Sequence, residues 1–491
     1  MCPVVNWQIM RQAWPNEPHR CTVICPANAT AGESEQIETE IIAGHAKEFH
    51  AKNWQRIATL SGIDSNGKTQ SDLLPRGYAN PKLKSIRAAL PGRSATNKIK
   101  GRPISPHTRH PLKNVYNRVA AAHHFLLTQI NTQRVTRLWD TASYVTRLRD
   151  ETESLQHTHS ARGGGQLKFL YRFGDLDGMY TDLSFKRMSE SLRSNIARVR
   201  ESTSNTTERK YPLRNLDRLC VGRSKSEPGH RVCTLGPAYN HAEQVEIRFT
   251  DLTDVCDYSN HTSIMRVGRE IRRYLQGTPM GEQGSCAKAN GVCLDDELRI
   301  DAAREAEFGD SERNLSLAFV DDKHARVAYD DILWSRESAQ QYIDLLMTYS
   351  APLKMVIEPI TRDIEFLETL TVYPIANGVG AYAKHKDRPW DNCNSYRIAR
   401  GGVSGMRRVQ TATATGTFMR ILDNCTNEYD AAIAISKEIY EMQCGARMLD
   451  SQTTTALQKL AKQNPENRNQ ERKRSGFYKR FHTIIAKLRF W

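Results

Sequence analysis

The sequence predicts an α+β fold in which short antiparallel strands are joined by helices and a helical segment follows. An apolar run at 167–173 has the length of a buried strand and is followed by an acidic residue. A second run at 315–320 is separated by a polar stretch from a third at 325–329, as in a β-hairpin. From residue 411 onward, apolar residues recur at helical spacing. Strands and hairpins followed by helices favour the α+β class.

The other elements are expected from the same periodicities. Apolar residues recur every three or four positions in further segments, which we expect to be helical. These segments are 33–60, 81–90, 111–139, 185–199, 286–308 and 338–349. Strands are expected at 263–267, 271–275 and 355–358, with hairpins around 244–253 and 364–373. Residues 1–32 have no clear period, and the Ser/Thr/Arg-rich segment 202–236 is interpreted as a long loop or insertion.

The composition excludes several classes of protein. The 491 residues are 39% hydrophobic and 25% charged, and the mean hydropathy is −0.61. No apolar stretch is long enough for a transmembrane helix, so we expect no membrane span. The N-terminal segment lacks a signal-peptide pattern, so the eleven cysteines are expected to be reduced thiols of an intracellular protein. Their spacing lacks the paired CxxC of structural zinc sites, so zinc is not favoured.

Positive charge is concentrated in two segments. The chain carries 70 Lys and Arg against 55 Asp and Glu, a net charge of +15. Residues 73–139 contain 13 basic and no acidic residues, and residues 471–491 contain seven basic residues and one acid. Such blocks typically contact phosphate backbones, because the release of counterions drives association. A solvated basic face is the alternative, and it is a stronger one for the tail than for the longer block.

Three acidic residues stand where strands are expected to end. Asp175 follows the run 167–173, and Asp321 and Asp322 lie between the two strands of the predicted hairpin. Neighbouring strands lie about 4.8 Å apart, so acids at matching ends can share metal ions. Carboxylates suit Mg²⁺, and we expect two Mg²⁺ or Mn²⁺ ions here. Both acidic groups end strands expected to be buried, where an unpaired charge would be costly without a metal.

A pair of metal ions held in this way supports nucleotidyl transfer, in which a 3′ hydroxyl attacks an α-phosphorus. An Asp-Asp doublet in a hairpin is also common turn chemistry, and Asp175 alone is only an acid at a strand end. A glycine-rich turn, 276–285, lies between the two acidic groups in the sequence. The order and spacing of the three features together indicate a template-directed nucleotide polymerase.

These features resemble the motifs of reverse transcriptases. The first three palm motifs resemble, in order, Asp175-Leu-Asp-Gly-Met-Tyr180-Thr-Asp-Leu183, Gln276-Gly-x-Pro-x-Gly281-x-x-x-Ser285 and Phe319-Val-Asp-Asp322. Asn97-Lys98-Ile-Lys100-Gly-Arg102-Pro-Ile104 resembles the fingers motif that grips the incoming triphosphate. Ala351-Pro-Leu-Lys354 and Glu365-Phe366-Leu367-Glu368 resemble the last two palm motifs. The likeness spans roughly residues 81–382 and is greatest to the Penelope-like retroelement and telomerase branch.

The resemblance implies a right-hand polymerase with fingers, an antiparallel-sheet palm and a helical thumb. The implied domains are an N-terminal extension (1–72), basic fingers (73–160), a palm (161–390), a helical thumb (391–470) and a basic tail (471–491). Cys286 stands where proline is usual in the family, and Thr369 ends a Phe-Leu-Glu-Thr sequence where Phe-Leu-Asp-Leu is more typical. These departures weaken the assignment to a branch more than the assignment to a catalytic polymerase.

The implied activity is that of an RNA-directed DNA polymerase of a retroelement, acting in the nucleus. Its partners would be an RNA template, a DNA or RNA primer and dNTPs. No nuclease pattern occurs in the C-terminal part, so either a separate endonuclease cuts the target or synthesis starts from existing ends. An RNA-dependent RNA polymerase and a catalytically inactive, domesticated nucleic-acid-binding protein are the alternatives.

The resemblance also implies roles for the acids and for the nucleotide site. Asp175 and Asp321 would bind both metal ions, and Asp322 would help to bind one of them. Tyr180 would lie under the sugar and reject a 2′ hydroxyl, although a core aromatic is the simpler interpretation. Gln276 and Gly277 would allow the chain to approach the nascent base pair closely.

The remaining implied roles concern the phosphates and the primer. Arg102 with Lys98 or Lys100 would hold the triphosphate, although contact of each lysine with the template backbone is the alternative. Lys354 is a candidate proton donor to pyrophosphate, or else an ordinary surface lysine. Phe366 and Leu367 would form a primer-gripping hairpin, although two apolar residues in a hairpin are more often core.

Overall fold

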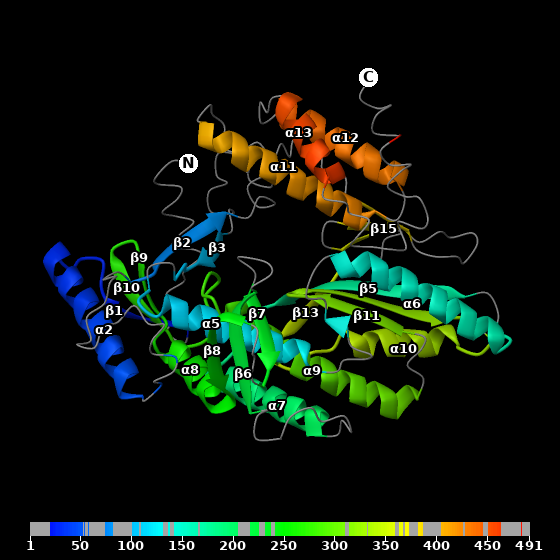
Figure 1. Ribbon diagram of the computed structural model, residues 1–491. Helices are drawn as coiled ribbons and strands as arrows, with labels where there is room; N and C mark the ends of the chain where they lie inside the picture. The colour runs from blue at the N-terminus through cyan, green and yellow to red at the C-terminus, as the bar shows by residue number, and fades with distance from the viewer. Residues whose placement is uncertain are drawn as a thin grey trace. The chain divides into compact units, whose positions relative to one another are not determined.

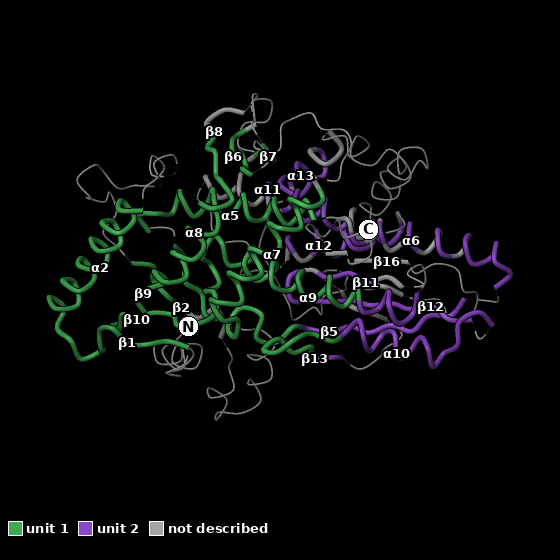
Figure 2. The backbone as a smooth tube through the Cα atoms, turned by 90° about the horizontal axis from the view of Figure 1, so that it is seen from below, with its two compact units in different colours: residues 1–133, 176–302, 348–355 green, residues 134–175, 303–347, 356–491 purple. Residues whose placement is uncertain are grey.

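The computed structural model describes about two thirds of the chain. The described residues are 20–52, 54, 57, 74–81, 101–107, 110–130, 136–137, 142–164, 167–204, 217–224, 231–236, 241–309, 314–330, 332–358, 363–366, 369–372, 382–385, 404–425, 428–444, 450–462 and 483. The chain forms two compact units (Figure 2). Unit 1 comprises residues 1–133, 176–302 and 348–355, and unit 2 comprises residues 134–175, 303–347 and 356–491.

Unit 1 is built on two sheets. The five-stranded sheet has the order β1-β10-β9-β2-β3, and the three-stranded sheet has the order β7-β6-β8. The strands are β1 (Cys21–Cys25), β2 (Arg76–Pro81), β3 (Gly101–Ile104), β6 (Arg218–Ser224), β7 (Arg231–Leu235), β8 (His241–Arg248), β9 (Ile264–Val267) and β10 (Glu270–Tyr274). Their pairings are antiparallel apart from the parallel pair of β2 with β9.

Several helices lie wholly or mostly in unit 1 (Figure 1). They are α2 (Ala31–Ala51), α5 (Lys113–Thr128), α7 (Phe185–Ser204), α8 (Phe249–His261) and α9 (Ser285–Phe308). Helix α2 begins in a capping box, in which Thr30 Oγ1 accepts from the Glu33 amide and Glu33 accepts from the Thr30 amide. Its apolar face packs on the five-stranded sheet in a buried cluster that includes Ile42, Ile264 and Ile271. Helix α5 packs against α8 and against the three-stranded sheet.

Most residues of a second five-stranded sheet, of order β13-β5-β12-β11-β4, lie in unit 2. The strands are β4 (Thr136–Arg137), β5 (Lys168–Asp177), β11 (Asn314–Phe319), β12 (Asp322–Tyr329) and β13 (Lys354–Ile357). Strand β12 lies between β5 and β11 and is antiparallel to both. Its residues from Lys323 to Ala328 are buried. Helix α6 (Ala142–Ala161) contacts β11, and α10 (Arg336–Leu346) contacts β12.

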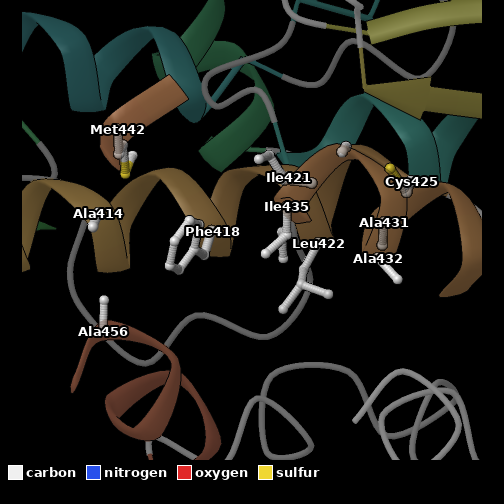
Figure 3. Packing of buried hydrophobic residues seen from close by; sticks show 11 residues of the cluster. Ala414, Phe418, Ile421, Leu422, Cys425, Ala431, Ala432, Ile435, Met442 and Ala456 are labelled. Atoms are coloured by element: carbon white, nitrogen blue, oxygen red, sulfur yellow. The ribbon is translucent and has the colours of Figure 1, made fainter. Parts of the chain in front are cut away.

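The C-terminal part of unit 2 consists of a small sheet and three helices. They are β14 (Asp363–Phe366), β15 (Thr369–Val372), β16 (Tyr382–His385), α11 (Ser404–Asn424), α12 (Glu428–Cys444) and α13 (Asp450–Lys462). Phe418 of α11, Ile435 of α12 and Ala456 of α13 belong to one buried core (Figure 3). Burial of this cluster gives the helices a shared apolar core.

The mixture of helices and mainly antiparallel sheets predicted from the sequence is confirmed. The strands expected at 167–173, 263–267, 271–275 and 355–358 are present, as are both strands of the hairpin at 315–329. The division into fingers, palm and thumb, and the five domain boundaries, stay predictions. Within the described residues, no helix has both the length and the apolar character needed to cross a bilayer.

Two segments expected to be irregular contain strands. Residues 21–25 form β1, which pairs with β10 from a distant part of the sequence. The segment 202–236 contains β6 and β7, which pair with each other. Each strand is short, and the partner that satisfies its backbone groups is supplied by the fold. Residues 244–253, expected to form a hairpin, instead hold the end of β8 and the start of α8.

The helix expected at 111–139 is too long, and a second helix was missed. Helix α5 ends at Thr128, whose hydroxyl donates to the Phe125 carbonyl, while the Gln129 amide donates to the Leu126 carbonyl. Such side-chain bonds to the backbone compete with helix propagation. Helix α6, with few apolar residues, has too weak a periodicity to be recognised from the sequence. Of the helix expected at 81–90, Pro81 instead ends β2, and residues 82–90 lie outside the described residues.

Candidate active site

The hairpin of β11 and β12 carries two of the three acids. Phe319 pairs with Asp322, so Val320 and Asp321 form a two-residue loop. Val320 has φ of 55°, in the left-handed region that a β-branched residue rarely adopts. Such loops usually place Gly, Asn or Asp there. The turn therefore holds a strained residue immediately before the two acids.

Strand register brings the third acid to the same place. Strand β12 pairs with β5 so that Asp322 lies opposite Asp175. Carboxylate oxygens of Asp175, Asp321 and Asp322 all lie within 4.8 Å of one another. Among the described residues, no other group of three or more His, Cys, Asp or Glu side chains meets so closely. The fold thus joins acids that are 146 positions apart in the sequence.

The donor set fits a hard divalent cation. Mg²⁺ binds oxygen ligands at about 2.0–2.1 Å, so two oxygens on one ion lie up to about 4.2 Å apart. The 4.8 Å limit is close to this value and suits a pair of ions that share ligands. Three negative charges at this spacing repel one another, which also favours a cation. Asp175, Asp321 and Asp322 are the residues that would hold Mg²⁺ or Mn²⁺.

The expectation that both acidic groups end buried strands is confirmed for β12 and wrong for β5, whose residues from Phe169 to Phe173 are half-buried. Asp175 is exposed, and Asp321 and Asp322 are half-buried. The acids lie at the turn and at the matching end of β5, and burial of β12 begins with the next residue, Lys323. The carboxylates are therefore accessible to ions and substrate, and water screens part of their repulsion.

The strand behind the acids contains a row of buried basic residues. Lys323 is 1% exposed and its Nζ donates to the Leu346 carbonyl. The Arg326 guanidinium lies 4.6 Å from the centre of the Phe169 ring. Burial, with a further contribution from Arg326, lowers the pKa of His324 to about 3, so this imidazole is neutral. These contacts anchor β12 to its neighbours.

The glycine-rich loop, residues 276–285, lies in unit 1 and is bonded to the segment that contains Tyr180. The Gly277 amide donates to the Leu183 carbonyl at 2.7 Å, and the Thr278 amide donates to the Tyr180 carbonyl at 2.7 Å. Gly277 has φ of 78°, and a Cβ atom there would lie 2.7 Å from the Tyr180 carbonyl oxygen. Glycine is therefore required for this approach. Gln276 precedes the contact and is half-buried, as is Tyr180.

The other side of the loop is bonded to β3. The Ser105 amide donates to the Met280 carbonyl at 2.7 Å, and Ile104 forms a β-bridge with Met280. Arg102 lies in β3 opposite Asn80, and its side chain is not among those described. Lys98 and Lys100 lie outside the described residues. The loop thus connects the backbone of the Tyr180 segment with that of the strand that carries Arg102.

A charged network missed by the sequence interpretation fixes the segment before Lys354. Asp296 of α9 accepts from the Arg187 guanidinium at 2.8 Å, from the Ser350 amide at 3.1 Å and from the Ser350 hydroxyl at 2.7 Å. Arg187 also donates to the carbonyls of Ser350 and Ala351. Lys354 begins β13 with an exposed side chain. Asp296 stands in the acidic run 295–297 of α9, and no local pattern distinguishes it from its neighbours, so the sequence carried no clear signal for this network.

The predicted primer-grip hairpin is confirmed as a hairpin. Strands β14 and β15 pair antiparallel, with Phe366 opposite Thr369. The Phe366 side chain is not described, and Leu367 lies outside the described residues. A role in gripping the primer stays a prediction. A cavity of about 690 Å³ in unit 1 is lined by none of the predicted site residues.

Comparison with protein-family models and with curated proteins finds no match. Among solved structures, the chain is similar to apo telomerase from Candida tropicalis, with 12% identity, 89% of this chain and 66% of that chain covered, and a TM-score of 0.42. It is also similar to telomerase from Candida albicans, with 11% identity, 91% of this chain and 70% of that chain covered, and a TM-score of 0.39. The BmCPV RNA-dependent RNA polymerase is similar with 11% identity, 84% of this chain and 30% of that chain covered, and a TM-score of 0.35.

The chain spans 60% of a C-terminally truncated telomerase from C. tropicalis, at 9% identity and a TM-score of 0.37. All these TM-scores are below 0.5. The functional conclusion therefore depends on the geometry of the chain's own residues.

Proposed function

We propose that this protein is a template-directed nucleic-acid polymerase, and specifically an RNA-directed DNA polymerase of a retroelement. The observation that carries the proposal is the meeting of Asp175, Asp321 and Asp322 within 4.8 Å. Asp175 and Asp322 lie opposite each other on the antiparallel strands β5 and β12, and Asp321 lies in the adjoining turn. Their order in the sequence, with a glycine-rich loop between them, is the pattern expected of such an enzyme.

The three carboxylates would bind two Mg²⁺ or Mn²⁺ ions. The ions would lower the pKa of the primer 3′ hydroxyl and neutralise charge on the leaving pyrophosphate. Asp175 and Asp321 would contact both ions, and Asp322 would contact one. Their exposure leaves room for the primer end and the triphosphate.

Other residues would bind the nucleotide and move a proton. Tyr180 would lie under the sugar and exclude a 2′ hydroxyl, and its backbone is fixed by the bond from the Thr278 amide. Arg102, with Lys98 or Lys100, would bind the triphosphate. Lys354, whose ammonium is exposed, could donate a proton to pyrophosphate.

The proposed partners are an RNA template, a DNA or RNA primer and dNTPs, in the nucleus. The excess of positive charge supports binding to phosphate backbones. A separate endonuclease would supply cut target ends, unless existing ends serve as primers. The Penelope-like branch is part of the proposal and depends on the motif pattern alone.

The test is extension of an oligo(dT) primer on poly(rA) with dTTP and Mg²⁺. The wild-type protein should extend the primer, and Asp175→Asn should lower the rate by on the order of 10³. Asp177→Asn is the matched control, because Asp177 is an exposed acid of the same strand outside the group of three. Undiminished extension by Asp175→Asn would refute the metal assignment.

Two other outcomes would replace the proposal. Preference for UTP over dTTP would identify an RNA-dependent RNA polymerase. Tight, strongly salt-dependent binding without extension by any nucleotide or metal would identify an inactive nucleic-acid-binding protein.

A further inference from the structure

A buried ion pair joins the glycine-rich loop to helix α9. Lys288 Nζ, on the first turn of α9, donates to Glu282 Oε1 at 2.7 Å. The two side chains are 4% and 3% exposed. Both residues lie within seven positions of each other, and neither was singled out by the sequence interpretation. Because removing two charges from water costs free energy, we ask what such a pair does next to the loop of a candidate nucleotide site.

The pair is connected to both ends of the loop and to a neighbouring helix. The Thr278 hydroxyl lies 3.4 Å from Glu282 Oε2 and donates to Ser285 Oγ at 2.9 Å. The Ser285 hydroxyl in turn donates to the Pro279 carbonyl. Lys288 Nζ also donates to the Ser259 hydroxyl of α8 at 2.8 Å. The loop is thus fastened to α8 and α9 by side chains that lie away from solvent.

Such a pair restricts the loop to one position. Each charge is strongly destabilised when it is buried without its partner, so any displacement that separates Glu282 from Lys288 is disfavoured. A network of this kind contributes little net stability compared with apolar packing, but it distinguishes sharply between one arrangement and its alternatives. A glycine-rich loop needs this restriction, because Gly277, Gly281 and Gly284 leave its backbone free to adopt other conformations.

The position of the loop determines two contacts on its outer side. The Gly277 and Thr278 amides donate to the carbonyls of Leu183 and Tyr180. The Met280 carbonyl accepts from the Ser105 amide, next to β3. A shift of the loop would therefore alter the backbone at Tyr180 and at the strand that carries Arg102.

We propose that the Glu282–Lys288 pair is a positioning device that fixes the glycine-rich loop against the Tyr180 segment and thereby sets the affinity for the incoming nucleotide. Its kinetic consequence rests on the proposed polymerase function. The pair would act on nucleotide binding through the Tyr180 segment and supplies no metal ligand, so its loss should change nucleotide KM more than kcat.

The experiment compares Glu282→Gln, the double variant Glu282→Gln/Lys288→Met and a control, Glu190→Gln. Glu190 pairs with Lys186 at 3.8 Å on the surface of the same unit, with side chains 59% and 83% exposed. The measurements are steady-state primer extension at varied dNTP and hydrogen exchange of the Gly277 and Thr278 amides. The double variant removes both charges, so it tests the loop even if Glu282→Gln does not fold.

Glu282→Gln and the double variant should raise the dNTP KM by about tenfold or more, with kcat within about threefold of wild type. Exchange of the Gly277 and Thr278 amides should become about tenfold faster. The control should match wild type in both measurements. A folded double variant with wild-type KM and wild-type protection of both amides would overturn the inference and leave the pair a purely structural one.

The two proposals can fail separately. Absence of primer extension by wild type would contradict the polymerase function, while faster exchange of the two amides in the variants would still support the role of the pair in holding the loop. Extension by wild type with unchanged exchange and KM in the double variant would contradict only the positioning role.

Discussion

The acidic hairpin of unit 2 and the glycine-rich loop of unit 1 achieve fixed geometry in different ways. In the hairpin, strand register sets Asp322 opposite Asp175, and the acids themselves are exposed or half-buried. In the loop, the chain is held by backbone hydrogen bonds on one side and by a buried ion pair on the other. The carboxylates of the hairpin are therefore accessible to ions from solvent, whereas the backbone of the loop is restricted to one position.

The difference predicts opposite responses to charge removal. Neutralising an acid in the hairpin removes repulsion between carboxylates that lie within 4.8 Å of one another. Neutralising Glu282 in the loop leaves a buried ammonium without its partner. Neutralising a hairpin acid should therefore not destabilise the metal-free protein, whereas neutralising Glu282 should destabilise it.

The largest effect should be the response of unit 2 to magnesium. A ligand that binds only the folded protein stabilises it by about 2.7 kcal/mol at 100 times its Kd. We expect Mg²⁺ to raise the Tm of wild type, and Asp321→Asn to lose this response while remaining at least as stable without metal. Thermal unfolding at increasing Mg²⁺ measures both. An equal Mg²⁺ response in Asp321→Asn would mean that the acids do not bind the ion.

The next largest effect should come from Gly277→Ala in unit 1. The new Cβ would lie 2.7 Å from the Tyr180 carbonyl oxygen at φ of 78°, so the free energy of unfolding should fall by about 2 kcal/mol. Chemical denaturation measures this change. Gly44→Ala on α2 is the control, because its Cβ meets nothing within 4 Å, and it should be neutral or slightly stabilising. Equal stability of the two variants would contradict the close approach.

Unit 1 should also lose stability in acid through His123. Burial, with contributions from Lys288 and His124, lowers the pKa of His123 to about 3, whereas an unfolded histidine has a pKa of 6.5. Between these values the unfolded chain binds the extra proton, so stability rises with pH in this window and is lost as pH falls through it. His123→Gln should make the dependence shallower by about 1.4 kcal/mol per pH unit below pH 6.5. Denaturant unfolding at pH 5.5 and 4.5 tests this; parallel dependences in both proteins would exclude the role of His123.

The smallest effect should come from the strained turn of unit 2. Val320 has φ of 55°, which asparagine adopts more easily than valine. Val320→Asn should raise the free energy of unfolding by about 1 kcal/mol, as measured by urea denaturation. Ala318→Ser in the adjoining strand, at a residue 3% exposed, provides a control in which no such gain is expected. A less stable Val320→Asn protein would show that the valine side chain contributes more than the strain costs.

The sequence by itself determined the elements with strong periodicity and the three acids. Helices α7, α9 and α10 and the hairpin of β11 and β12 follow from the spacing of their apolar residues, and turn chemistry marks Asp321 and Asp322. It did not reveal α6, whose apolar face is weak, or β1, β6 and β7, whose backbone partners come from other parts of the chain. The pattern of apolar residues in a short segment contains no information about pairing partners that lie far away in the sequence.

Only the tertiary structure decided which side chains meet. The pairing of β12 with β5 brings Asp175 to Asp322, and the packing of the glycine-rich loop on α8 and α9 joins Glu282 to Lys288 and Ser259. The structure also decided that the acids are open to solvent while the charges under the loop are not. Residue type fixes what a group can do chemically, but its exposure and its partners depend on long-range packing, which no local pattern encodes.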